Sequence, residues 1–148
     1  SYVAPWDDSK VIENGKVDLI FSQAVLEHID SIEESYSIMA NWLKPNGNMS
    51  HQVDFKCHGL SNNWNGHWTY SENLWKIIRG KRPYLLNRCC LSDHLSFLKK
   101  AGFQIEFTQT VEAENLLTKK DLAKKFKGIS QVDLTTSGLY FIASHNGV

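Results

Sequence analysis

Acid–base side chains follow two apolar segments of the chain, and these residues are the ones best suited to chemistry. His28 comes shortly after the apolar run at 19–21, and Asp54 and His58 come at and after the end of a second segment. Imidazoles and carboxylates accept protons near neutral pH, so each of the three could act as a general base toward a hydroxyl substrate. The alternative is structural: a histidine packed at the start of a helix, and a loop of packed aromatic side chains. We expect Glu27, beside His28, to be structural.

The sequence contains no motif of a metal site, of a serine nucleophile or of a phosphate-binding loop. His51, Cys57, His58 and His67 are possible metal ligands, but no C-x-x-C or H-E-x-x-H spacing is present, so we expect no metal. The sequence also has no G-x-S-x-G nucleophile turn and no phosphate-binding loop. The segment 56–70 contributes tryptophan and tyrosine side chains, which could form the walls of a substrate pocket.

The elements that must position these residues alternate between strand and helix. The run at 17–22 is continuously apolar at its centre, which favours a strand buried on both faces. Ser31 and Glu34 have the spacing of a capping box, and apolar residues follow at helical spacing, so a helix is expected over 31–43. A second strand is expected over 48–55.

The alternation continues after a long loop at 56–70. Ser71 and Ser92 each precede a helical pattern and are expected to be N-caps. In the first of these two helices we expect Leu74, Ile77 and Ile78 to face inward. The expected elements are helices at 72–79, 93–101 and 118–126 and strands at 103–111 and 138–144.

The stretch VDLIFSQAVLEHI, followed by WLKPNG, resembles the second half of a class I S-adenosylmethionine-dependent methyltransferase. The family pattern is an Asp-apolar-apolar strand, a small or polar residue, Leu-Glu-His, a helix and a Leu-Lys-Pro-Gly-Gly turn. The chain offers Asp18, Ser22, 26–28 and 43–47 at these places. It departs from the pattern at Asn46, where a glycine is usual, but asparagine tolerates the left-handed backbone, so the turn is expected to survive. The stretches RCCLSDHLSFLKKAGFQIEF and SGLYFIAS resemble later elements of the same family.

The resemblance implies an incomplete Rossmann-like methyltransferase fold of the α/β class, with about four mainly parallel strands and flanking helices. Residues 1–148 would form a single domain, the C-terminal part of a methyltransferase-like α/β domain. The family's glycine-rich strand-to-helix turn, which cradles the cofactor by close backbone approach, has no counterpart in the chain. The alternation itself indicates a largely parallel sheet, and the short link before 138–144 suits an antiparallel strand at an edge.

The implied cofactor is S-adenosyl-L-methionine, bound beyond the carboxyl ends of the strands. Ser22, Gln23 and Ala24 would line its pocket, and Trp6 and Asp7 would lie against its adenine. The implied activity is methyl transfer to an unidentified small-molecule, sugar or lipid acceptor, with one of the three candidate bases above. The alternative is a non-catalytic methyltransferase-like module that serves interaction or assembly.

Charge and cysteine content limit the partners and the cellular compartment that we expect for the protein. Lys and Arg (16) balance Asp and Glu (16), so no nucleic-acid or membrane surface driven by bulk charge is expected. No apolar run reaches the roughly 18 residues of a membrane span. Three cysteines, two of them adjacent, suit a reducing compartment, so we expect a cytoplasmic protein. The first strand, without its neighbours, would expose an edge that we expect a second copy or another part of the protein to cover.

Overall fold

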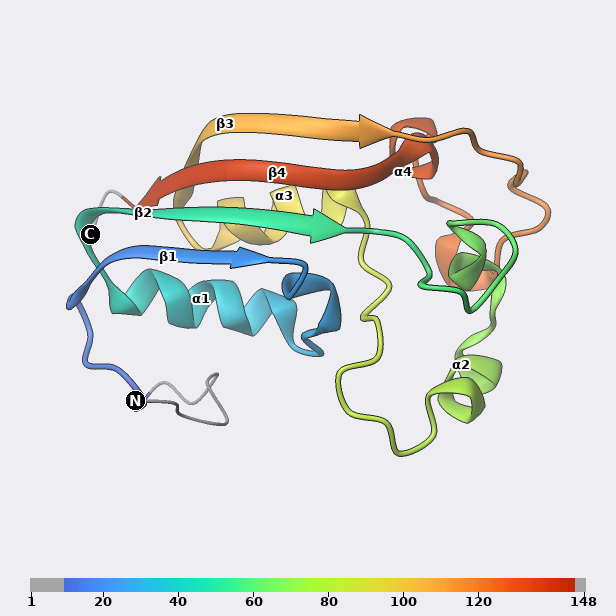
Figure 1. Cartoon of the computed structure of the whole chain (residues 1–148), viewed down its shortest axis with the longest axis horizontal. Helices are drawn as coiled ribbons and strands as arrows, with labels where there is room; N and C mark the ends of the chain where they lie inside the picture. The colour runs from blue at the N-terminus through green and yellow to red at the C-terminus, as the bar shows by residue number, and fades with distance from the viewer. Residues whose placement is uncertain (1–9, 146–148) are drawn as a thin grey trace.

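A computed structural model describes residues 10–145 of the chain, and a four-stranded sheet forms its centre. The strands are β1 (Val17–Gln23), β2 (Leu43–Asp54), β3 (Phe103–Glu112) and β4 (Thr136–His145). They lie in the order β1-β2-β4-β3, with β1 parallel to β2 and β4 antiparallel to both of its neighbours. Therefore β1, β2 and β3 point the same way and β4 points back (Figure 1). This mixed sheet confirms the α/β fold with mainly parallel strands.

The antiparallel strand lies inside the sheet, whereas we expected it at an edge. β4 pairs with β2 through Met49 and Ala143 and with β3 through Ile105 and Ala143, so both of its sides are hydrogen-bonded. The route of the chain explains this position. The segment 113–135 turns back at the end of the sheet where β3 finishes, so the next strand runs in the opposite direction (Figure 1).

Two helices, α1 (Ile32–Trp42) and α3 (Leu91–Lys100), cover one face of the sheet (Figure 1). They share one buried cluster with the sheet, to which Tyr36, Leu98 and Phe141 contribute fully buried side chains. The buried positions of α1 follow the helical spacing of the sequence. Each large apolar side chain buried in this way stabilises the fold by about 1.5–3 kcal/mol, so this layer anchors the strands.

The sequence predicted the backbone after the end of α1 correctly, but not the capping at its start. Ser31 precedes the helix, but its side chain makes no capping hydrogen bond, so the expected capping box with Glu34 is wrong. The backbone of Ser31, at φ −98° and ψ 57°, lacks the extended geometry of an N-cap, and its carbonyl accepts a hydrogen bond from Ser35 Oγ at 3.0 Å. Beyond the other end, Asn46 has a φ of +63°, as the expected left-handed turn requires.

The start of α3 also differs from the expected N-cap. The capping pair is Cys90 and Asp93, not Ser92. Ser92 lies inside the helix and its hydroxyl donates to Asp133 at 2.9 Å, which ties α3 to the segment before β4. Cys90 and the other two cysteines are free thiols, in line with their unsuitable spacing for disulfides.

Helix α2 (Glu72–Arg79) begins where the sequence indicates, because Ser71 Oγ accepts a hydrogen bond from the N–H of Leu74 at 3.3 Å. Its expected inward face is right for Ile78, which is half-buried against a small apolar cluster, and wrong for Leu74 and Ile77. Leu74 is 44% and Ile77 is 77% exposed, whereas Trp75 is buried in a small cluster away from the sheet. The helix therefore docks through Trp75 and Ile78 against this cluster and not against the sheet.

The remaining elements are short and connect the larger ones. They are η1 (Leu26–His28), η2 (Gly66–Thr69), η3 (Lys124–Phe126) and α4 (Gln131–Thr135). The helix expected over 118–126 is only a run of turns that ends in η3, because the Thr118 hydroxyl donates to Asp121 at 2.7 Å and closes a local turn. Among residues 10–145, no helix combines the length and apolar content needed to cross a bilayer.

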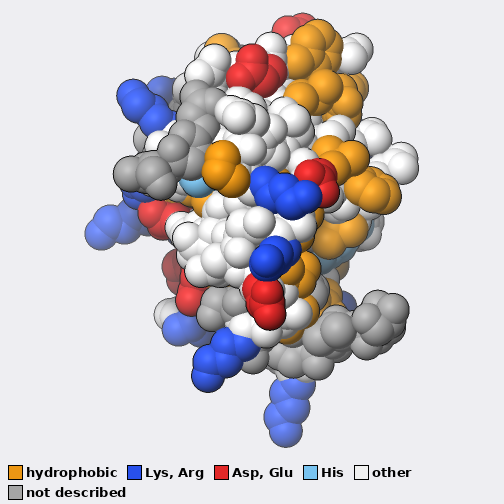
Figure 2. Space-filling model, turned by 90° about the vertical axis from the view of Figure 1, so that its left-hand side faces the viewer, with side chains coloured by type: hydrophobic (Ala, Val, Ile, Leu, Met, Phe, Trp, Pro, Cys, Tyr) orange, Lys and Arg blue, Asp and Glu red, His pale blue; other side chains and the backbone are white. Residues whose placement is uncertain are grey.

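The other face of the sheet is not covered by any element within residues 10–145. Leu19 is 54% and Phe21 is 77% exposed, which corrects the expectation that β1 is buried on both faces. The strand register places Phe21, Ser50, Ile142 and Phe107 in one row across this face. Figure 2 shows hydrophobic side chains gathered along one side of the molecule. The apolar run of β1 fits a second covering layer that the described residues do not supply.

We expect the isolated 148-residue chain to self-associate through this face and the open edge of β1. Phe21→Lys should weaken self-association roughly tenfold or more, because it removes a large apolar contact from the interface. Size-exclusion chromatography with light scattering over a concentration series measures the effect. Ile77→Lys, at an equally exposed position of α2, is the matched control and should change nothing. A strictly monomeric unmodified chain would contradict the expectation.

Candidate functional site

The candidate site lies where β1 and β2 end. The two strands are parallel and place Gln23 opposite Gln52, so their carboxyl ends finish side by side at one edge of the sheet. η1 follows β1 closely, and the chain continues from the end of β2 through Asp54 to His58. The two segments that carry the predicted acid–base residues therefore meet at the right-hand end of the sheet in Figure 1.

His28 and His58 come together across this edge. Their ring centroids lie 5.3 Å apart. His28 is half-buried, and its Nδ1 lies 2.8 Å from the carbonyl oxygen of Tyr84. A carbonyl oxygen only accepts hydrogen bonds, so Nδ1 carries the proton and Nε2 keeps its lone pair. In this tautomer Nε2 can accept a proton or bind a cation.

Asp54 lies beside the second histidine. Its Oδ2 is 3.4 Å from Nε2 of His58, and its Oδ1 accepts a hydrogen bond from the N–H of Lys56 at 2.9 Å. Both side chains are about one-third exposed, so solvent and ligands reach them. His58 has a φ of +50°, in the left-handed region that side chains rarely adopt, and such backbone strain clusters at functional sites. The structure therefore brings the three candidate bases named from the sequence into one neighbourhood.

Glu27, which we expected to be structural, lies in the same neighbourhood. It is 3% exposed, and within residues 10–145 neither of its carboxylate oxygens has a hydrogen-bond partner. Burial raises the pKa of Glu27, while the nearby His28 and His58 act in the opposite direction. Metal-capable atoms of Glu27, His28 and His58 lie within 4.8 Å of one another.

Asn87 fixes the turn that carries Glu27 and His28. Its Nδ2 donates to the carbonyl oxygens of Leu26 at 2.8 Å and Ile29 at 2.9 Å. Its backbone N–H donates to the carbonyl oxygen of Glu27 at 2.8 Å. Three hydrogen bonds from one distant residue hold η1 in place, so the acid–base side chains are presented on a rigid support. No motif in the sequence pointed to this role.

The expected cofactor residues at the end of β1 differ in accessibility. The Ser22 hydroxyl is half-buried and bonds Nδ1 of His51 at 2.7 Å, so its side chain is already engaged. Gln23 and Ala24 are exposed, and Ala24 has a φ of +51°, which turns the chain sharply at the strand end. These residues can form one wall of a ligand pocket along the open side of β1.

The other expected cofactor residues, Trp6 and Asp7, lie outside the described residues. The four possible metal ligands named from the sequence, which are three histidines and Cys57, also do not lie together. His51 bonds the end of β1, and Cys57 Sγ donates to the carbonyl oxygen of Asn63 at 3.2 Å. Of those four, the acid–base cluster includes only His58.

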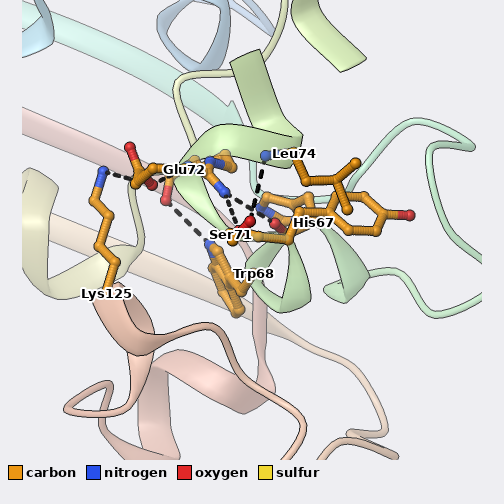
Figure 3. Close-up of polar contacts among 8 residues, drawn as sticks. His67, Trp68, Ser71, Glu72, Leu74 and Lys125 are labelled. Carbon is orange, nitrogen blue, oxygen red and sulfur yellow. Dashed lines mark hydrogen bonds and ion pairs between the residues drawn. The ribbon is translucent and has the colours of Figure 1, made fainter. Parts of the chain in front are cut away.

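His67, Glu72 and Lys125 belong to a polar network (Figure 3). The buried Arg88 joins them, through Glu72 and the carbonyl oxygen of His67. The Arg88 side chain is 1% exposed, pairs with Glu72 and donates to the carbonyl oxygen of Tyr70 at 2.8 Å. Its guanidinium lies 4.6 Å from the centre of the Trp75 ring. Burial and the neighbouring Arg88 lower the pKa of His67 to about 3, so this imidazole is neutral. The network supports the loop and is closed to a substrate.

A cavity of about 10 Å³, roughly the room of one water molecule, lies below the cluster beside Glu27, Asp54 and Arg88. A larger hollow of about 510 Å³ lies at the opposite edge of the sheet, beside Pro45 and His145. We place the candidate site at the carboxyl edge because the acid–base side chains converge there. The small cavity is an extension of that site into the protein, too small for a substrate.

Comparison with known proteins gives matches in structure only. No protein-family model matches the chain, and no curated protein matches it. A S-adenosylmethionine-dependent methyltransferase from Methanosarcina mazei aligns with a TM-score of 0.59 over 91% of this chain and 62% of its own, at 12% identity. The phosphoethanolamine N-methyltransferase 2 of Haemonchus contortus, solved with S-adenosyl-L-methionine, aligns at 0.52 over 92% and 35%, at 18% identity. The cyclase SpnF aligns at 0.54 over 91% and 52%, at 14% identity.

These likenesses establish the fold. The chain has an α/β fold of the class I methyltransferase type, as the resemblance of its sequence implied. It spans 62%, 35% and 52% of the lengths of the three structures, which agrees with an incomplete form of that fold. A cyclase shares the fold with methyltransferases, so the activity has to be argued from the site itself.

Proposed function

We propose that the chain is the C-terminal part of a single methyltransferase-like α/β domain and acts in methyl transfer from S-adenosyl-L-methionine. The observation that carries this proposal is the convergence of His28, Asp54 and His58 at the carboxyl ends of two parallel strands, beside the open end of β1. Ligands of open α/β sheets bind beyond this edge. The free cysteines suit the cytoplasmic location that we propose for the protein.

The cofactor would lie against the end of β1. Gln23 and Ala24 are exposed there, and Ser22 can contribute its backbone while its hydroxyl stays with His51. By resemblance, the segment of Trp6 and Asp7 would flank the adenine. S-adenosyl-L-methionine supplies an activated methyl group when bound. The chain's own contribution is to hold the two reactants in line and to exclude water from between them.

The acceptor would be a nucleophile on a small molecule, a sugar or a lipid head group. With a hydroxyl acceptor, a base on the protein would take the hydroxyl proton as the methyl group is transferred. His28 is the favoured base, because the proton on its Nδ1 leaves the Nε2 lone pair free. Asp54 and His58, paired at 3.4 Å, are the second candidates.

Replacement of the favoured base tests this assignment. His28→Ala should lower turnover of methyl transfer by the full-length gene product about 100-fold, the usual contribution of general acid–base catalysis. Transfer of labelled methyl from S-adenosylmethionine, measured over hydroxyl and amine acceptors, gives the readout. His145 lies at the opposite end of the strands from the site, so His145→Ala is the matched control and should keep full turnover. Unchanged turnover in His28→Ala would remove this residue from the mechanism.

The uncovered sheet face favours a second function, a non-catalytic module for interaction or assembly. Phe21, 77% exposed on the edge strand β1, is placed to contact another protein surface. A gene product that forms a stable heteromeric complex and binds no S-adenosylhomocysteine would support the module. Binding of S-adenosylhomocysteine would favour the enzyme.

A further inference from the structure

The acid–base cluster contains a buried carboxylate without a partner. Glu27 is 3% exposed, and across residues 10–145 both of its oxygens lack a hydrogen bond. Burying a carboxylate without compensation is costly, so a group in this state calls for an explanation. The cavity beside it admits about one water, which donates two hydrogen bonds to a carboxylate with about four acceptor sites. A bound cation would compensate the carboxylate more completely.

Two imidazoles lie beside the carboxylate at distances that a cation could bridge. Ligand atoms of Glu27, His28 and His58 all lie within 4.8 Å of one another. Ligands that share one Zn²⁺ ion at about 2.0–2.2 Å lie about 3–4.4 Å from each other. We propose that these three residues form a binding site for a divalent transition-metal ion, with Zn²⁺ as its simplest occupant.

Both histidines are oriented as metal-bound histidines are. The Tyr84 carbonyl oxygen lies 2.8 Å from Nδ1 of His28, which leaves Nε2 for the ion. Asp54 lies 3.4 Å from Nε2 of His58, which leaves Nδ1 for the ion. A carbonyl or carboxylate on the far nitrogen fixes the tautomer and raises the basicity of the ligating nitrogen. Asn87 adds a third support, because it holds the turn that carries the first two ligands.

The ligand set selects the class of metal. Two imidazole nitrogens and one carboxylate suit Zn²⁺, Co²⁺, Mn²⁺ or Fe²⁺, whereas Mg²⁺ and Ca²⁺ prefer oxygen ligands throughout. Three protein ligands leave at least one coordination position for water or a substrate oxygen. With an ion in place, His28 and His58 are ligands and Asp54 is the remaining candidate base. The site does not depend on the methyl-transfer proposal, since metal binding is measured on its own.

Direct titration tests the site. Chelator-treated chain is titrated with Zn²⁺ by calorimetry and with Co²⁺ by visible absorption, which reports the geometry around the metal. We expect one saturable site per chain. Glu27→Gln and His58→Ala should each weaken binding roughly tenfold or more. Glu27→Gln should also leave the thermal midpoint of the metal-free chain unlowered, because it removes an uncompensated buried charge.

A histidine outside the cluster supplies the control. His145 is the last residue of β4 and lies at the end of the strands away from the site, so His145→Ala should bind metal as the unmodified chain does. Should Glu27→Gln fail to fold, the exposed His58 carries the test, since its replacement leaves the core intact. Absence of saturable binding, or equal weakening in the control and the cluster variants, would overturn the proposal.

Discussion

Lowering the pH from 7 to 5 should reduce the free energy of unfolding by on the order of 5 kcal/mol. The cause is three buried histidines, His51, His67 and His94, each 1% exposed or less. Burial lowers their pKa values from 6.5 to about 4 for His51 and to about 3 for His67 and His94. Domains of this size are stable by about 5–15 kcal/mol, so the loss is a large part of the total.

The sign follows from the difference between the folded and unfolded states. Below pH 6.5 the three histidines take up protons when the chain unfolds but stay neutral in the folded chain. The unfolded state therefore gains about 1.4 kcal/mol per histidine for each pH unit below 6.5. The stabilisation is fully present above pH 6.5 and is lost progressively down to the folded pKa values of about 4 and about 3. Glu27 acts weakly in the opposite direction, because burial raises its pKa.

Urea unfolding at pH 7, 6 and 5 measures this dependence. His94→Gln is the informative variant, because an amide can keep the hydrogen bond that His94 Nδ1 makes with the Tyr36 hydroxyl at 2.7 Å but does not titrate. Between pH 7 and 5 the free energy of unfolding of this variant should fall by about one-third less than that of the unmodified chain, since one of the three titrating groups is gone. This comparison holds whatever the stability of the variant at pH 7. A free energy of unfolding that stays level between pH 7 and 5 would show that the buried histidines do not set the acid stability.

Arg88→Ala should destabilise the fold by about 3–5 kcal/mol. The guanidinium lies between the rings of Trp75, at 4.6 Å, and Phe126, at 4.9 Å, so its removal leaves a cavity between them. It also leaves the carbonyl oxygen of Tyr70 without its donor. The variant removes a packing element, a charge partner and a hydrogen-bond donor at once, and thermal or urea unfolding measures the combined loss.

Glu72→Gln separates the charge from the packing. Glu72 pairs with Arg88, and its side chain is 52% exposed and also lies 3.8 Å from Lys125 (Figure 3). The glutamine amide can still accept a hydrogen bond from Arg88, and Lys125 no longer competes for a carboxylate, so this variant should cost less than Arg88→Ala. If Glu72→Gln proved as damaging as Arg88→Ala, the ion pair and not the packed guanidinium would hold the loop.

Two local features of the fold were predicted correctly, although the local capping pattern at Ser31 was not. Ser71 caps α2 through a hydrogen bond within its own turn, and Asn46 adopts the left-handed φ that the turn demands. Features set by distant contacts were not predictable in this way. Ser92 has the composition of a cap, yet its hydroxyl is taken by Asp133. The apolar run of β1 indicated burial on two faces, but Phe21 is exposed because nothing within residues 10–145 lies over it.

The candidate site also contains residues that could be named from the sequence and residues whose roles depend on distant contacts. His28, Asp54 and His58 could be named from the sequence because they follow two strands, and the parallel pairing of those strands brings them together. Glu27 could not be assigned, since only its burial beside two imidazoles distinguishes it from a surface carboxylate. Asn87 was equally hidden, because its role depends on contacts with a turn far away in the sequence.

The central claim is that a S-adenosylmethionine site is built against the end of β1. Calorimetric titration of the full-length gene product with S-adenosylhomocysteine, beside the same titration of the 148-residue chain, tests it most directly. We expect saturable binding by the gene product. Binding by the chain as well would mean that Gln23, Ala24 and their neighbours suffice, and binding by the gene product alone would mean that the glycine-rich part of the fold is required. Absence of binding by both would contradict the account.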